Sequence, residues 1–237
     1  MRNRKVLLGC VPLAALLMLS SPLVLFAAGT MEARKAGWEE DTPGRWNSLP
    51  ERKVAAGDDF FRAEVVLSPG TGVLWEKKMK RNLLPEDSLS IEMMSKGTNR
   101  TSRDYREVEA HFPLSVTVVF GEDSVDLPGK KRVADFFRGI RHGFSPGGIR
   151  LTFAYGNEAP VKSMYRLGEE ETVFILGGEE ERGKRIKEAR KIKEDFRAAY
   201  GRDPRGPVTR ILVSAIRPSR EDGQIEVEIH LSSPLLK

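Results

Sequence analysis

The strongest constraint on the fold is a two-residue alternation of apolar and polar side chains that recurs along the chain. The clearest case is the segment IEVEIHL at residues 225–231, where every second residue is apolar. Successive side chains of a strand point to opposite faces of a sheet, so this segment buries one face and leaves the other free. Similar β-rich segments lie at residues 60–68, 72–77, 88–94, 112–120, 149–155, 172–176 and 208–216.

Two segments follow a helical period instead. Residues 130–142 place apolar residues three or four apart and are followed by Gly143, and residues 181–200 do the same before Gly201. The first half of the second segment is heavily charged, which weakens its helical pattern. Because helices are too few to alternate with the strands, the sequence predicts a mainly β protein. We expect an antiparallel β-sandwich, jelly-roll-like, with two helical insertions.

The N-terminal residues have the order of parts found in export signals. Basic residues at positions 2, 4 and 5 precede an apolar run at 6–28 that ends in small residues. We interpret residues 1–29 as a cleavable signal peptide, with an uncleaved N-terminal anchor as the alternative, because about 20 apolar residues can span a bilayer. In both cases the rest of the chain is expected to be periplasmic or extracellular, with membrane contact only through this segment if it is uncleaved.

The segment after the leader differs from the rest of the chain. Residues 30–50 are polar and carry several glycines and prolines, so we expect a linker or a loosely docked arm before a β-sandwich domain at 51–237. Trp38 and Trp46 are unusual in a linker. They are expected either to pin the arm to the domain or to meet a protein partner.

Charge and cysteine content narrow the class further. The net charge of +5 falls to +2 without the three basic leader residues, so no nucleic-acid partner is expected. The single cysteine is Cys10, inside the leader, so the remainder can hold neither a disulfide nor a thiolate metal site. An export signal without mature cysteines favours a bacterial envelope protein.

No motif in the sequence identifies a catalytic or metal centre. The three histidines are far apart and lack metal-ligand spacing. Residues 178–185 superficially resemble a phosphate-binding loop, but three acidic residues stand where phosphate would bind. Carboxylates are abundant without an evident pair. We therefore expect no metal and no cofactor and identify no catalytic residue; a non-enzyme is favoured, and an enzyme stays open as the alternative.

The candidate ligand-binding residues are Trp75, Tyr155 and Asn157, which lie at expected strand ends. An aromatic face can stack on a sugar ring, and an amide can bond its hydroxyls. The alternative is that the rings are core residues and Asn157 a turn residue. Asp195, Phe196 and Tyr200 are expected to be structural, fixing a helix to a sheet.

The segment RKIKEDFRAAYGRDPRGPVTRILVSAI at residues 190–216 resembles the domain-of-unknown-function family 3047. The order Asp195, Phe196, Tyr200, Gly201 and Pro204 is similar to that family's pattern. Further similar stretches are 114–121, 151–160 and 172–176, so that the resemblance covers roughly residues 53–231.

This resemblance implies an exported bacterial protein with a β-sandwich core, and it implies no activity. The chain departs from the family in two places where the family tends to carry acidic residues. Ala110 and His111 stand near the position of paired aspartates, and RPSRED at 217–222 replaces an aspartate-rich stretch. If those acids serve a cation or polar ligand in the family, the site is weakened here.

Three functions remain open on these grounds. The preferred one is a non-catalytic envelope protein whose sandwich binds a glycan or another envelope component. The second is a glycan-acting hydrolase that uses two carboxylates not identified by the sequence. The third is a structural module that docks to a protein partner through Trp38 and Trp46.

Overall fold

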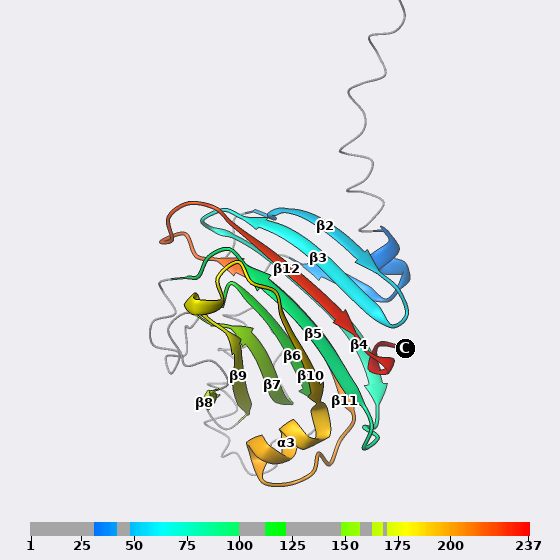
Figure 1. The fold of residues 1–237 in the computed structure, drawn as a ribbon. Helices are drawn as coiled ribbons and strands as arrows, with labels where there is room; N and C mark the ends of the chain where they lie inside the picture. The colour runs from blue at the N-terminus through cyan, green and yellow to red at the C-terminus, as the bar shows by residue number, and fades with distance from the viewer. Residues whose placement is uncertain (1–30, 42–47, 100–111, 122–147, 157–162, 168–169) are drawn as a thin grey trace, which may run out of the picture.

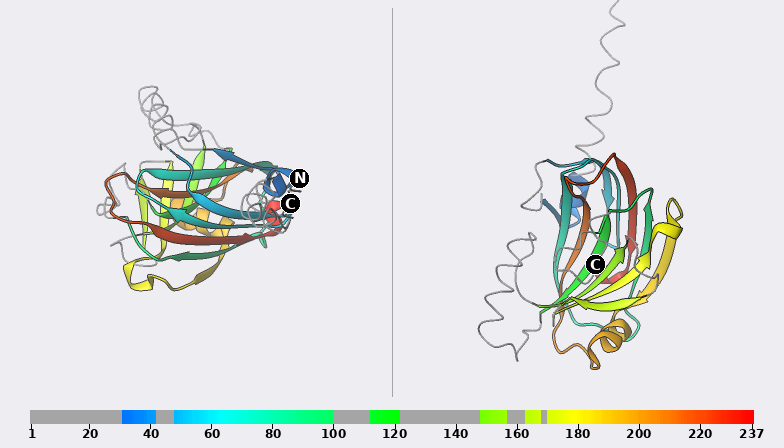
Figure 2. Two further views of the ribbon diagram at one scale, coloured as in Figure 1. Left: turned by 90° about the horizontal axis from the view of Figure 1, so that it is seen from above. Right: turned by 90° about the vertical axis from the view of Figure 1, so that its left-hand side faces the viewer.

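The computed structural model describes residues 31–41, 48–99, 112–121, 148–156, 163–167 and 170–237. These residues form a mainly β structure of two sheets that face each other across one apolar core (Figures 1 and 2). The predicted mainly β class is therefore confirmed. None of the helices within the described ranges has the length and apolar composition of a membrane span.

One sheet has seven strands. In spatial order they are β1 (Trp38–Asp41), β4 (Thr71–Arg81), β11 (Val208–Arg217), β6 (Leu114–Phe120), β7 (Ile149–Tyr155), β9 (Glu171–Gly177) and β8 (Met164–Leu167). Their pairings are antiparallel except for β7 with β9, which is parallel. The expectation of an antiparallel sheet therefore fails at this single pair.

The second sheet has five strands, all paired antiparallel, and faces the viewer in Figure 1. In spatial order they are β10 (Ile186–Lys191), β5 (Ser88–Ser95), β12 (Ile225–Ser232), β3 (Phe60–Leu67) and β2 (Glu51–Ala56). The alternation seen in the sequence sets their two faces. Ile225, Val227, Ile229 and Leu231 of β12 point into the core, while the residues between them point outward.

The outer faces of the two sheets differ in exposure. In β6 all seven residues are buried, and β7 and β11 are buried along most of their length. Hydroxyl side chains on the outer face therefore bond each other: Ser115 with Ser214 at 2.7 Å, and Thr117 with Thr152 at 2.9 Å. The outer face of the five-stranded sheet, in contrast, is exposed or half-buried throughout.

The predicted helix at 181–200 is wrong in its first half. Helix α3 covers only Ile192–Tyr200, while residues 186–191 form β10 and residues 179–181 a short 3-10 turn, η3 (Glu179–Glu181). The charged residues of β10 alternate in exposure, and the strand pairs with β5 over its whole length. Edge pairing therefore overrides the helical period there. The predicted helix at 130–142 lies outside the described residues.

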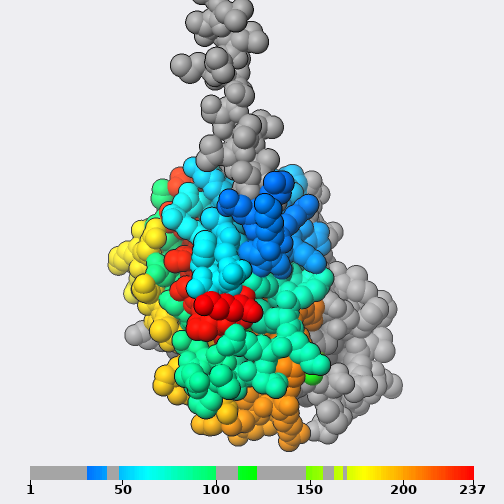
Figure 3. All heavy atoms as spheres, turned by 90° about the vertical axis from the view of Figure 1, so that its right-hand side faces the viewer, coloured from blue at the N-terminus to red at the C-terminus, as the bar shows by residue number. Residues whose placement is uncertain are grey.

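The expected arm is partly integrated into the sandwich. Residues 31–35 are helical, and Trp38–Asp41 form the edge strand β1. Trp38 is buried and its ring lies 4.3 Å from that of Phe61, so it is a core residue and cannot meet a partner. Trp46 lies outside the described residues. The helical residues 31–35 and the C-terminal turn η4 (Pro234–Leu236) lie on the same side of the molecule (Figure 3).

Candidate functional site

The candidate site is the outer face of the five-stranded sheet, which we call the open face. It consists of the outward side chains of β2, β3, β12, β5 and β10. Neighbouring strands lie about 4.8 Å apart, so five strands present a surface about 19 Å wide. This face combines accessibility with a dense set of hydrogen-bonding groups.

Strand register arranges these groups in rows that cross the sheet. In one row Arg62 of β3 lies opposite His230 of β12, His230 lies opposite Glu92 of β5, and Glu92 lies opposite Lys187 of β10. Side chains directly opposite each other on one face have Cβ atoms about 5 Å apart and interact. The row therefore presents cation, imidazole, carboxylate and cation in sequence.

Ion pairs connect the strands of the open face. Lys187 of β10 lies 2.6 Å from Glu92 of β5, and Lys96, just after β5, lies 2.6 Å from Glu226 of β12. A further pair, Arg62 with Glu64 at 2.7 Å, lies within β3. Arg185, just before β10, pairs with Glu228. The hydrogen bond from Lys187 lowers the pKa of Glu92, and the bond to Glu226 raises the pKa of Lys96. Each shift favours the charged form of the group concerned, Glu92 or Lys96.

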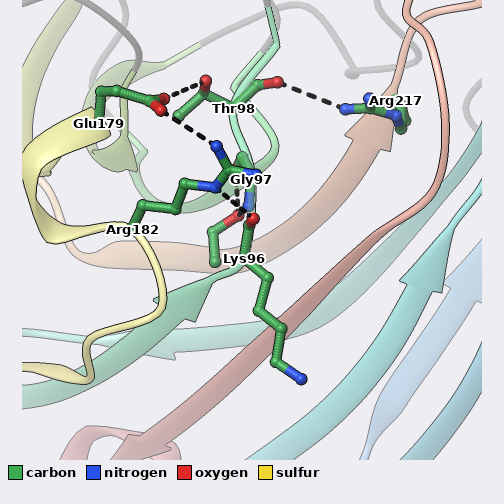
Figure 4. Close-up of polar contacts among 7 residues, drawn as sticks. Lys96, Gly97, Thr98, Glu179, Arg182 and Arg217 are labelled. Carbon is green, nitrogen blue, oxygen red and sulfur yellow. Dashed lines mark hydrogen bonds and ion pairs between the residues drawn. The ribbon is translucent and has the colours of Figure 1, made fainter.

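A network at the end of β5 fixes one corner of this face (Figure 4). Arg182 donates from Nε to the backbone oxygen of Lys96 at 2.8 Å, and Thr98 donates to Glu179 at 2.7 Å. Arg217 donates to the backbone oxygen of Thr98 at 3.4 Å. The Lys96 side chain points away from this network in Figure 4, and its ammonium reaches Glu226 of β12.

A shallow, open hollow of about 190 Å³ lies over β2, β3 and β12. Its polar lining includes Lys53, Glu64 and Glu228, and Val66 lies among them. Phe60, at the start of β3, is 37% exposed, and its ring lies edge-on to His230 with centroids 6.5 Å apart. The face therefore offers an apolar ring beside polar groups, and its hollow is open rather than enclosing.

The aromatic residues expected to bind a ligand lie elsewhere. Trp75 is buried in the core, and its indole Nε1 donates to Glu40 at 2.9 Å. Tyr155 is also buried in the core. Neither ring is accessible to a surface ligand, because both point inward from their strands. Asn157 lies outside the described residues.

The three residues expected to fix helix to sheet lie between these elements. Phe196 is buried with its ring 4.6 Å from that of Phe120 on β6. Tyr200 donates to the backbone oxygen of Arg150 on β7 at 2.8 Å. Asp195 accepts from Arg190 of β10 at 2.6 Å, and burial raises the pKa of Asp195 despite this pair.

Sequence reasoning missed the open face as a site, although its alternation was noted. Glu226, Glu228 and His230 belong to the 225–231 segment, whose alternation predicts one free face. Charge complementarity between strands could have extended the prediction from this one strand to the whole open face. The register between distant segments, however, cannot be read from one sequence. Within the described ranges no group of three or more histidine, cysteine, aspartate or glutamate residues could hold a metal.

Comparison with known proteins gives weak likenesses only. No family model matches the chain, and no curated protein matches it, so the resemblance to family 3047 stays a prediction. Among solved structures, the catalytic domain of Humicola grisea Cel12A, in complex with a soaked thio cellotetraose, is similar with a TM-score of 0.43 and 9% identity. That match covers 84% of this chain and 92% of the other.

Two further solved structures match across most of this chain. An agarase, AgWH50C, has a TM-score of 0.27 and 7% identity over 83% of this chain. PfGH50B has a TM-score of 0.23 and 10% identity over 82%. In each case the match covers 24% of the other protein. Likenesses of this size carry no functional argument, so the proposal below rests on the geometry of the open face.

Proposed function

We propose that this chain is an exported, non-catalytic binding module of the bacterial envelope, built on a jelly-roll-like sandwich. Its open face would bind a glycan. The observation that carries the proposal is a five-stranded sheet whose outward face is accessible and lined by hydrogen-bonding side chains in register. Export, as the sequence of residues 1–29 predicts, would bring such a face to the compartment of the envelope glycans.

The shape of the face supports an extended ligand over a small one. Sites for small molecules are concave and typically hold about 300–1,000 Å³, whereas the hollow here holds about 190 Å³. A polysaccharide chain lies across a surface and presents hydroxyls that both donate and accept. Glutamate oxygens accept such bonds, and arginine and lysine nitrogens donate them. Phe60 adds an apolar ring against which the C–H face of a sugar can pack.

Replacing Phe60 tests this proposal without disturbing the core, because the ring is partly exposed. We expect Phe60→Ala to weaken retention on insoluble polysaccharides or peptidoglycan about tenfold, a loss of about 1.4 kcal/mol. Met164→Ala is the matched control, because Met164 is an exposed apolar residue on β8 of the other sheet. Retention that is absent for the unaltered chain, or equal for both variants, would contradict the proposal.

A second function is favoured by one observation. Glu64 of β3 lies directly opposite Glu228 of β12 on the open face. Side chains directly opposite each other have Cβ atoms about 5 Å apart, and the two carboxylates of a retaining glycosidase lie at a similar separation of about 5 Å. Each carboxylate, however, already accepts a hydrogen bond from an arginine, Glu64 from Arg62 and Glu228 from Arg185. Binding is therefore the preferred role.

The two functions are separated by product release. A hydrolase would release reducing ends from a polysaccharide, and both Glu64→Gln and Glu228→Gln would abolish that release. The binding module would release none, with or without these substitutions. Sustained turnover by the unaltered chain, lost in both variants, would replace our proposal with the second function.

A further inference from the structure

We propose that the open face selects uncharged polysaccharides over acidic or amino polysaccharides. This inference rests on the proposed function and names its ligand class. It follows from how the charges of the face are distributed, since they are compensated within the face itself rather than left for a ligand.

The compensation is a property of the strand pairing. Glu92 and Lys187 lie directly opposite each other on β5 and β10, and they form an ion pair at 2.6 Å. Glu226 of β12 forms an ion pair with Lys96, which directly follows β5. Glu228 of β12 forms an ion pair with Arg185, which directly precedes β10. The directly opposite carboxylates Glu64 and Glu228 are also each paired with a cation, Arg62 and Arg185, so that the acidic groups named here all have a cation beside them.

A charged ligand would have to displace one partner of such a pair. An anionic group bound to Lys187 would leave Glu92 without its cation, and the ligand's charge would then lie beside that carboxylate. Like charges at neighbouring positions of a sheet are destabilising. A cationic group bound to Glu92 would face the same cost from Lys187. A hydroxyl can use the remaining donor and acceptor positions and leaves the pair intact.

The charges on β2, an edge strand of the open face, are also balanced. Glu51 and Lys53 lie two residues apart on β2, point outward together and are exposed. Their opposite charges cancel over a distance shorter than the Debye length of about 8 Å at physiological ionic strength. A charged polymer that approaches along β2 therefore meets no sustained attraction.

The test compares three classes of polymer with the full chain. Retention is measured on an uncharged glucan, on a polyuronate and on a polyglucosamine, each at low and at high sodium chloride. We expect retention on the uncharged glucan to change less than twofold with salt, and at least tenfold weaker retention on both charged polymers. Tighter retention on a charged polymer, lost at high salt, would overturn the inference while the proposed glycan binding stands. Absence of retention on all three would overturn both.

A variant with an unbalanced face gives an independent check. Lys187→Gln removes the cation beside Glu92, so we expect it to gain retention on the polyglucosamine at low salt. Lys193→Gln is the matched control, because it makes the same charge change on helix α3, where Lys193 pairs with Asp203 at 3.4 Å. Equal retention by both variants on the polyglucosamine would contradict the inference, because the local pairing would then not govern selection.

Discussion

Single side chains connect helix α3 to the sheets, and Tyr200 does so through its hydroxyl. This group donates to the backbone oxygens of Arg150 at 2.8 Å and Glu170 at 3.1 Å. Arg150 lies on β7, and Glu170 directly precedes β9, the strand that pairs with β7 in parallel. The hydroxyl therefore stabilises the position of helix α3 against that part of the seven-stranded sheet.

We expect Tyr200→Phe to lower the free energy of unfolding by about 1–2 kcal/mol at neutral pH, because the buried hydrogen bond from its hydroxyl to the backbone is lost. Burial raises the pKa of Tyr200 to about 12. An unfolded tyrosine loses its proton near pH 10, so the folded state binds more protons between about pH 10 and 12. This contribution is complete below pH 10 and is lost as the pH rises to about 12.

Chemical denaturation of both proteins across this alkaline range measures the effect. The unaltered chain should lose stability more steeply than Tyr200→Phe between pH 10 and 12. Parallel curves would show that the hydroxyl is not buried in the way described.

At the scale of elements, the junction of β10 and α3 shows where sequence patterns suffice and where they fail. The helix ends where its stop signal predicts, at Gly201, which has a φ of +71° in the left-handed region. Its beginning was misplaced because residues 186–191 carry apolar residues at a spacing that suits a helix. Pairing with β5 decides their conformation, and that partner lies about a hundred residues earlier in the chain.

We expect Gly201→Ala to destabilise the fold by about 1 kcal/mol, because an alanine in the left-handed region is strained. No neighbouring atom lies within 4 Å of the position an added Cβ would take, so the cost should be conformational alone. Thermal unfolding measures it. Gly201→Asn serves as a control, since asparagine tolerates this region better, and it should cost less than the alanine variant. An alanine variant as stable as the unaltered chain would contradict the cap assignment.

At the scale of the whole molecule, the sequence predicted the class of fold, but it predicted neither the edge strand β1 nor the face that the aromatic rings occupy. Alternation identified most strands, since each buries one face, and it pointed to the open face through residues 226–230. It did not identify β1, because four residues around a single tryptophan carry too little pattern. The ligand residues were misassigned for a related reason: Trp75 and Tyr155 lie near expected strand ends, but which face an aromatic ring occupies depends on the opposing sheet.

The strand β1 joins the two sheets along one edge of the sandwich. Glu40 of β1 accepts from Trp75 of β4 at 2.9 Å and from Arg52 of β2 at 2.7 Å. Trp38 is buried against Phe61. We expect Trp38→Ala to cost about 3–5 kcal/mol of stability, the range for removing a large buried aromatic side chain. Urea denaturation measures this loss of stability. A loss below about 1 kcal/mol would show that residues 38–41 are a loosely docked arm and not part of the core.

The central claim is that glycan binds on the outer face of the five-stranded sheet. Its most direct test is a titration of the isotopically labelled protein with an uncharged oligosaccharide, followed by nuclear magnetic resonance. We predict that the shifted resonances belong to outward residues of β3, β12 and β5, Phe60, His230 and Glu92 among them. Shifts that fall instead on the seven-stranded sheet, with the open face unchanged, would contradict the account.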